Sequence, residues 1–192
     1  MSAELIDWRG LAPQRWKNGA GSTRELAVEP PGATMDNFEW RISVAEVSQD
    51  APFSAFAGVD RCITLLRGAG MALRSPQGDV MLDRIGEPFH FAGERAVVAA
   101  LVDGTCEDFN VMVRRGVHQA QVTSLESAAT LTAAPVGLVA CLEGRWHCEG
   151  MVLGPGQAWL WRGGMPDLRI EPEAAPAQAI AVQIRRSPGA SP

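Results

Sequence analysis

The chain has 192 residues but no tyrosine, only three histidines and a single lysine, Lys17. The absence of tyrosine excludes chemistry that needs a tyrosine side chain as an acid. His90, His118 and His147 are far apart in the sequence and cannot fill two histidine-rich metal sites, so neither a metal nor another cofactor is expected. The formal net charge of −5 and the scarcity of lysine argue against nucleic-acid binding.

Long apolar runs are missing as well. The longest, residues 96–102, is far shorter than the roughly 20 residues that cross a membrane. Two acidic residues among the first seven are unlike a secretory leader, so we expect a cytoplasmic protein that stays out of membranes. The four cysteines form no C-x-x-C pair. A hairpin turning at Gly144-Arg145 would set Cys141 opposite Cys148 and make a disulfide conceivable, but reduced thiols suit a cytoplasmic chain better.

Glycine and proline are plentiful, at 20 and 13 residues, which favours short strands joined by turns. Residues 40–47, W-R-I-S-V-A-E-V, alternate with period two, so Arg41 and Ser43 share one face and Trp40 lies on the other. One helix is plausible, near residues 125–134. Further strands are predicted at 24–29, 62–67, 71–74, 80–83, 88–91, 96–102, 109–114, 119–123, 137–142, 146–149, 157–161, 168–170 and 179–184.

An internal repeat of the sequence pattern suggests that one structural unit occurs twice. Residues 63–73 and 80–93 run strand, glycine turn, strand, Gly/Pro corner and aromatic strand, and residues 138–150 and 152–164 repeat that order. The spacing resembles the cupin repeat. We therefore predict an all-β bicupin, with two small cupin-like β-barrels of jelly-roll type in residues 1–118 and 119–186 and a disordered tail at 187–192. A single irregular β-sandwich is the alternative.

Metal-binding cupins usually supply a His-x-His pair, a glutamate and a further histidine. The three histidines here stand alone, and the corner at Gly154-Pro-Gly156 is followed by no histidine. The sequence therefore predicts no metal site, and each histidine is expected to be a surface or structural residue.

The most distinctive segment is residues 16–25, W-K-N-G-A-G-S-T-R-E. Its G-x-G is too short for a dinucleotide-binding loop, because the third glycine and the following helix are missing. The glycines are better explained by a tight turn that brings Asn18 and Thr23 to one place. Thr23 and Glu25 then share a face of the strand that follows.

This segment resembles the opening motif of the HutD/Ves family. The resemblance continues in order through F-x-W-R-I-S at 38–43, A-P-F-S at 51–54, G-x-D-R at 58–61, L-x-G-x-G at 66–70 and D-F-N-V-M-x-R-R-G at 108–116. It covers residues 8 to 118 and then becomes diffuse. Ala20 and Ala51 stand where many members have glycine, but neither change removes a functional group.

The resemblance implies a two-barrel cupin fold and a role in histidine utilisation. HutD members are regarded as regulators that limit expression of the histidine-breakdown operon, and are thought to bind a pathway intermediate rather than to catalyse a step. Ves-type members are described only as stress-induced. We accordingly expect a negative regulator that binds urocanate, formiminoglutamate or formylglutamate, although the sequence does not separate the two branches.

The polar residues before position 116 suit a small carboxylate-bearing ligand. An arginine fork grips a carboxylate with two hydrogen bonds, which are stronger inside a barrel than in water. Arg41 and Arg61 are the candidate forks, and Lys17 is a compact cation near them. The remaining candidate ligand-binding residues are Asn18, Thr23, Glu25, Trp40, Ser43 and Asn110.

Three alternatives remain open at this point. A metal-independent cupin isomerase or hydrolase would use Glu25 as general base and Arg41 to hold the substrate. A protein-interaction module would have its barrel lumen filled by side chains. The arginines would otherwise be ordinary surface charges, with Glu25 their structural partner. A second copy of the chain is also a possible partner, as a homodimer.

Overall fold

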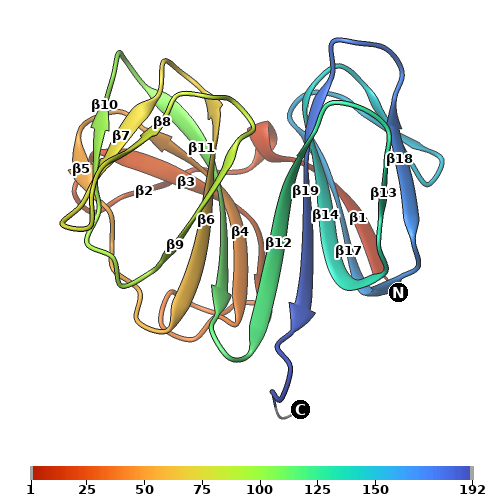
Figure 1. The fold of residues 1–192 in the computed structure, drawn as a ribbon, viewed down its shortest axis with the longest axis horizontal. Coiled ribbons are helices and arrows are strands. Elements are labelled where there is room, and N and C mark those ends of the chain that lie inside the picture. The colour runs from red at the N-terminus through yellow and green to blue at the C-terminus, as the bar shows by residue number, and fades with distance from the viewer. Residues whose placement is uncertain (1, 191–192) are drawn as a thin grey trace.

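The computed structural model describes residues 2–190, and within that range it is built almost entirely of β-strands (Figure 1). One 3₁₀ turn, η1 (Trp8–Gly10), is the helical element of the described chain, and no helix there is long and apolar enough to cross a membrane. The strands are β1 (Ser2–Asp7), β2 (Gln14–Arg15), β3 (Gly21–Glu29), β4 (Trp40–Val47), β5 (Ala51–Pro52), β6 (Val59–Arg67), β7 (Met71–Arg74), β8 (Val80–Leu82), β9 (Pro88–Ala92), β10 (Val98–Leu101), β11 (Cys106–Arg114), β12 (His118–Leu125), β13 (Ala129–Leu131), β14 (Ala134–Glu143), β15 (Trp146–Cys148), β16 (Met151–Leu153), β17 (Gln157–Met165), β18 (Leu168–Pro172) and β19 (Gln178–Arg186). Every strand predicted from the sequence falls on one of these.

The strand order shows that the fold repeats with an offset of eight strands. One large sheet contains the order β4-β11-β6-β9, and the other contains β12-β19-β14-β17. The two small sheets run β5-β10-β7-β8 and β13-β18-β15-β16, which is the same order again. Each half is thus an eight-stranded jelly-roll unit, seen side by side in Figure 1. The internal repeat in the sequence pattern therefore corresponds to a repeat of the strand topology.

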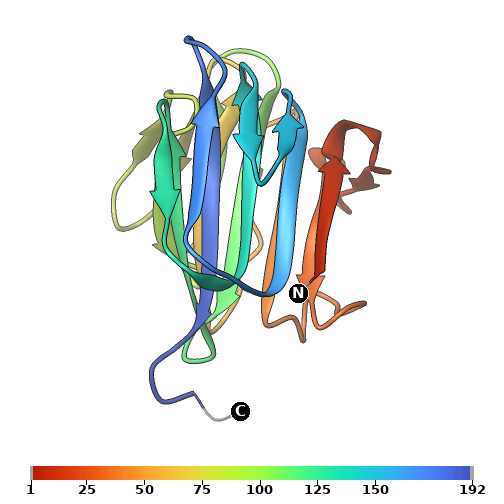
Figure 2. The ribbon, with the colours of Figure 1, turned by 90° about the vertical axis from the view of Figure 1, so that its right-hand side faces the viewer.

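The first strand, β1, does not pair with the half of the molecule that follows it in the sequence. β1 pairs antiparallel with β17, from Ser2 opposite Arg162 to Asp7 opposite Gln157, so it forms the edge of the second large sheet (Figure 2). Our sequence-based division placed residues 1–118 together, and the strand pairing differs from it at this N-terminal end. β12, the first strand of the second half, begins at His118.

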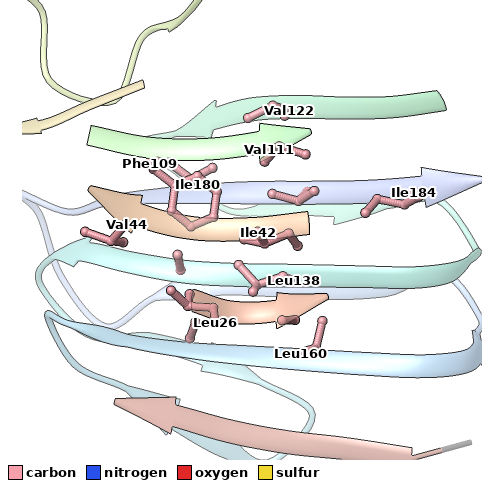
Figure 3. Packing of buried hydrophobic residues seen from close by; sticks show 14 of the residues in the cluster. Leu26, Ile42, Val44, Phe109, Val111, Val122, Leu138, Leu160, Ile180 and Ile184 are labelled. Carbon is pink, nitrogen blue, oxygen red and sulfur yellow. The ribbon is translucent and has the colours of Figure 1, made fainter. Parts of the chain in front are cut away.

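The two large sheets pack face to face on a shared apolar layer (Figure 3). Ile42 and Phe109 come from the first half, and Leu138 and Ile180 from the second; all four are fully buried. Alternation explains this layer: the residues of β4 and β11 that face it are apolar, whereas their neighbours in the chain point into the first half. The halves therefore share one core.

The interiors of the two halves differ. Trp146, Trp159 and Trp161 fill the space between the sheets of the second half, together with many aliphatic residues. Gly137 is needed there because a Cβ atom at that position would lie 2.2 Å from the Trp161 ring. In the first half, a cluster around Ile63, Leu65 and Leu73 fills one part of the interior and leaves the remainder for polar side chains.

Three local predictions need correction. Residues 125–134 contain no helix; they include β13, because Leu125 and Leu131 are buried in the second-half cluster and the strand pairs with β18. Gly144-Arg145 joins two different sheets, since β14 and β15 are not paired, so it closes no hairpin. The tail is ordered as far as residue 190: Ser187 is buried, and its N–H donates to the Val117 carbonyl at 2.9 Å. Residues 191–192 lie outside the described residues.

Candidate ligand-binding pocket

A cavity of about 660 Å³ opens into the first half. Arg41 and Ser43 on β4, Arg61 on β6, and Asp108 and Asn110 on β11 line it. These strands are adjacent in the order β4-β11-β6, and strand alternation points all five side chains away from the shared core. The period-two prediction for β4 is therefore confirmed.

The 16–25 motif forms one wall of the cavity. Its turn is closed by Gly19 N–H donating to the Trp16 carbonyl at 3.1 Å, with Gly19 at a φ of +73°, and by Ala20 N–H donating to Asn18 Oδ1 at 3.1 Å. Trp16 Nε1 donates to Thr23 Oγ1 at 2.8 Å and fixes the indole over the cavity. Asn18 and Thr23 both line this wall, as the proposed turn predicted, and Lys17 lines it beside them.

Arg41 is held in place by two residues. Its Nε donates to Glu25 Oε2 at 2.7 Å, and its Nη1 donates to Ser43 Oγ at 3.1 Å. The arginine is only 8% exposed, whereas the Glu25 side chain is 43% exposed. Glu25 does not itself line the cavity, so it is the residue that orients Arg41.

Arg61 occupies a deeper position. Its Nη1 donates to the Ser54 carbonyl at 3.3 Å and its Nη2 to Asn110 Oδ1 at 3.1 Å. Its guanidinium lies 4.9–5.6 Å from the ring centroids of Phe53, Phe56 and Phe91, a favourable cation–π arrangement. Burial lowers the pKa of Arg61 to about 10, with a smaller lowering from Arg41, so it stays protonated at neutral pH.

Asp108 completes the group, and sequence reasoning did not single it out. Asn110 Nδ2 donates to its Oδ1, while its Oδ2 is buried with no hydrogen-bond partner among the described residues. Burial raises the pKa of Asp108 to about 7, because Arg61 and the Asn110 amide offset only part of the desolvation. The only signal in the sequence was its place at the start of the D-F-N-V-M motif.

The charge of the cavity wall is positive. Arg15, Lys17, Arg41 and Arg61 line it, against one acidic residue, Asp108. Among the described residues, no group of three or more histidine, cysteine, aspartate or glutamate side chains is arranged to hold a metal ion. The cavity is therefore suited to small anions.

The predicted site residues separate into three groups. Glu25 lies behind Arg41, as described above. Trp40 is outside the site: it packs in the shared core and its ring lies 5.5 Å from the Arg162 guanidinium, because it has the opposite strand parity. The structure brings the others together at the cavity, namely Lys17, Asn18, Thr23, Arg41, Ser43, Arg61 and Asn110.

Sequence reasoning also missed the aromatic part of the wall. Trp16, Phe53 and Phe56 line the cavity, and the Trp16 and Phe53 rings meet edge to face with centroids 6.4 Å apart. All three fall in or next to motifs that we noted for the family resemblance. Phe53 and Phe56 also contact the Arg61 guanidinium, and neither motif has a sequence signature for that contact.

Comparison with known proteins identifies the family. A family model described as HutD matches residues 9–181. The chain belongs to the HutD family. This confirms the resemblance seen in the sequence, and the HutD name links the family to histidine utilisation. Protein Ves from Citrobacter koseri is 35% identical over 191 residues, covering 98% of this chain and 97% of its own length.

Solved structures share the fold of this HutD family member. A conserved protein of unknown function from Pseudomonas aeruginosa PAO1 is 29% identical, with a TM-score of 0.84, covering 96% of this chain and 99% of that one. HutD from Pseudomonas fluorescens SBW25 has a TM-score of 0.86 at 24% identity, covering 97% and 100%. A cupin 2 conserved barrel protein from Leptotrichia buccalis, with a TM-score of 0.57 at 11% identity and coverage of 95% and 96%, shows that the fold is cupin-like.

Proposed function

We propose that this protein binds a small carboxylate-bearing metabolite of histidine breakdown in its first-half cavity and thereby acts as a negative regulator of histidine utilisation in the cytoplasm. The metabolite is urocanate, formiminoglutamate or formylglutamate. The observation that carries the proposal is the convergence of two buried guanidinium groups, Arg41 and Arg61, on one cavity.

Burial makes these arginines effective anion ligands. A charge-assisted hydrogen bond contributes about 1.5–3 kcal/mol, and more of it is retained where water is excluded. Arg41 donates from Nε to Glu25 and from Nη1 to Ser43, and among the described residues no hydrogen bond involves its Nη2. A ligand carboxylate can accept from Arg41 Nη2 without breaking the bonds that hold the side chain.

The rest of the wall suits the remainder of such a metabolite. Asn18, Thr23 and Asn110 provide neutral polar groups for an amide, formyl or imino function, and Trp16 and Phe53 provide apolar surface. Regulation then follows if the metabolite-bound protein, or the removal of free metabolite, limits expression of the pathway. The tryptophan-filled second half supports the first or forms an interface, including one with a second copy of the chain.

The test is calorimetric titration of the full chain with each of the three metabolites. We expect binding of at least one, and we expect Arg41→Ala and Arg61→Ala each to weaken it roughly 10- to 150-fold, the equivalent of one charge-assisted bond. Arg74→Ala is the matched control, because Arg74 is exposed at the end of β7 and does not line the cavity. Absence of binding at millimolar concentration for all three would refute the proposal.

Two other results would change the proposed function. Unchanged affinity in both cavity variants would place the binding site elsewhere. Conversion of a metabolite during overnight incubation, followed by NMR, would support an enzyme in place of a binding protein.

A further inference from the structure

Asp108 has no role in the proposed function, yet its surroundings are unusual. It is 1% exposed and lies in the middle strand of the three that form the cavity wall. Its only hydrogen-bond partner among the described residues is the Asn110 amide, although a carboxylate can accept about four hydrogen bonds. A buried ionised carboxylate with so few donors is poorly stabilised.

The Asn110 side chain connects this carboxyl group to an arginine. Asn110 Oδ1 accepts from Arg61 Nη2 at 3.1 Å, and Asn110 Nδ2 donates to Asp108 Oδ1. Arg61 makes no direct ion pair within residues 2–190, so the ionised Asp108 is its counter-ion through one intervening amide. Arg41, in contrast, has its own counter-ion in Glu25 at 2.7 Å.

We propose that Asp108 takes up a proton when an anionic ligand occupies the cavity, so that the protein binds one carboxylate together with one proton. This inference rests on the proposed function, because it concerns the same cavity. A ligand carboxylate next to Arg61 becomes the new counter-ion of that guanidinium. Two negative charges close together in a buried site are unfavourable, and Asp108 relieves the repulsion by becoming neutral.

Other charged groups lie near Asp108 and bear on its protonation. The charged groups that share the cavity wall with it are Arg41 from β4, Arg61 from β6, and Arg15 and Lys17 from the segment before β3. Glu107, its neighbour on β11, raises the pKa of Asp108 slightly. With the ligand absent, burial places that pKa at about 7, so the proton is available near neutral pH. A bound anion raises the pKa of Asp108 further.

This coupling fixes the pH dependence of affinity. Below about pH 7, Asp108 already carries its proton in the free protein, so affinity is nearly constant. Above that pH, binding must recruit the proton from solution, and the dissociation constant rises about tenfold per pH unit until the pKa of the complex is reached. Above about pH 7, the pocket therefore binds an anion tightly only when Asp108 takes up a proton at the same time.

The experiment measures proton uptake by titration calorimetry at pH 8 in buffers of different ionisation enthalpy. The full chain is titrated with formylglutamate, which has no group that titrates near this pH, and with urocanate and formiminoglutamate. The variant is Asp108→Asn, which is close in shape and permanently neutral. The control is Asp83→Asn, since Asp83 is exposed and remote from the cavity wall.

We expect the wild type and Asp83→Asn to take up about one proton more than Asp108→Asn for any ligand that binds. Asp108→Asn should bind at least tenfold more tightly than the wild type at pH 8.5 and should lose the pH dependence. Binding with equal proton uptake in all three proteins overturns this inference and leaves the proposed function intact. A folded Asp108→Asn protein that still takes up the proton assigns it to another group and also overturns the inference. Failure of all three metabolites to bind overturns both proposals.

Discussion

The buried carboxyl group of Asp108 should make the stability of the free protein depend on pH. Its pKa is 3.8 in an unfolded chain and about 7 in the folded one, so folding raises it by about 3 units. The contribution to stability is complete below the unfolded pKa and is lost as pH rises through 7, because the folded state binds the proton more tightly. At about 1.4 kcal/mol per unit, the free energy of unfolding should fall by about 4 kcal/mol between pH 4 and pH 8 from this group alone.

Asp108→Asn isolates that contribution. Urea unfolding of the wild type and the variant would be followed by tryptophan fluorescence from pH 5 to pH 8. The difference in unfolding free energy between the two proteins cancels every other titrating group. We expect this difference to shift in favour of the variant by ~1.4 kcal/mol per pH unit up to about pH 7, and then to level off. A pH-independent difference would show that Asp108 is not a buried, poorly solvated carboxyl group, and would refute the reasoning.

Two further predictions concern the packing of the second half and the state of the thiols. Gly137→Ala should lower the free energy of unfolding by ~1–3 kcal/mol, because its Cβ would overlap the Trp161 ring, whereas Gly10→Ala, with nothing within 4 Å, should not; chemical denaturation would measure both. An equal effect of the two substitutions would contradict the close contact. All four cysteines are buried and free, and burial raises the pKa of Cys62 and Cys148 to about 12, so a thiol reagent at pH 8 should react slowly with the native protein and with four thiols per chain after denaturation without reductant. Two reactive thiols in place of four would reveal a disulfide.

Strand alternation accounts for most of what the sequence predicted about the site. A period of two places Arg41 and Ser43 on one face and Trp40 on the other, whatever the sheet packs against. The expected convergence of Asn18 and Thr23 depended on a local turn, which glycine and asparagine chemistry specifies. Such short-range rules do not depend on distant parts of the chain, so they were reliable here.

The acidity of Asp108 could not be predicted from these short-range rules. Its acidity depends on burial and on Asn110 and Arg61, and Arg61 is on a different strand. Only tertiary structure sets these quantities. The incorrect helix at 125–134 has a related cause. That segment has weak local preference, and the pairing of β13 with β18 decided its conformation.

The pairing of β1 with β17 has a consequence for how the protein is made. Ser2 lies opposite Arg162, so β1 must wait for about 160 further residues to be synthesised before its partner strand exists. At about 5–20 residues per second, that delay is roughly 10–30 s. A contact of such long range also slows folding after synthesis. During the wait β1 is an unpaired edge, and its Leu5 is 53% exposed even in the folded protein. A partner fused ahead of β1 therefore lies beside a strand pairing that forms only after most of the chain has been synthesised.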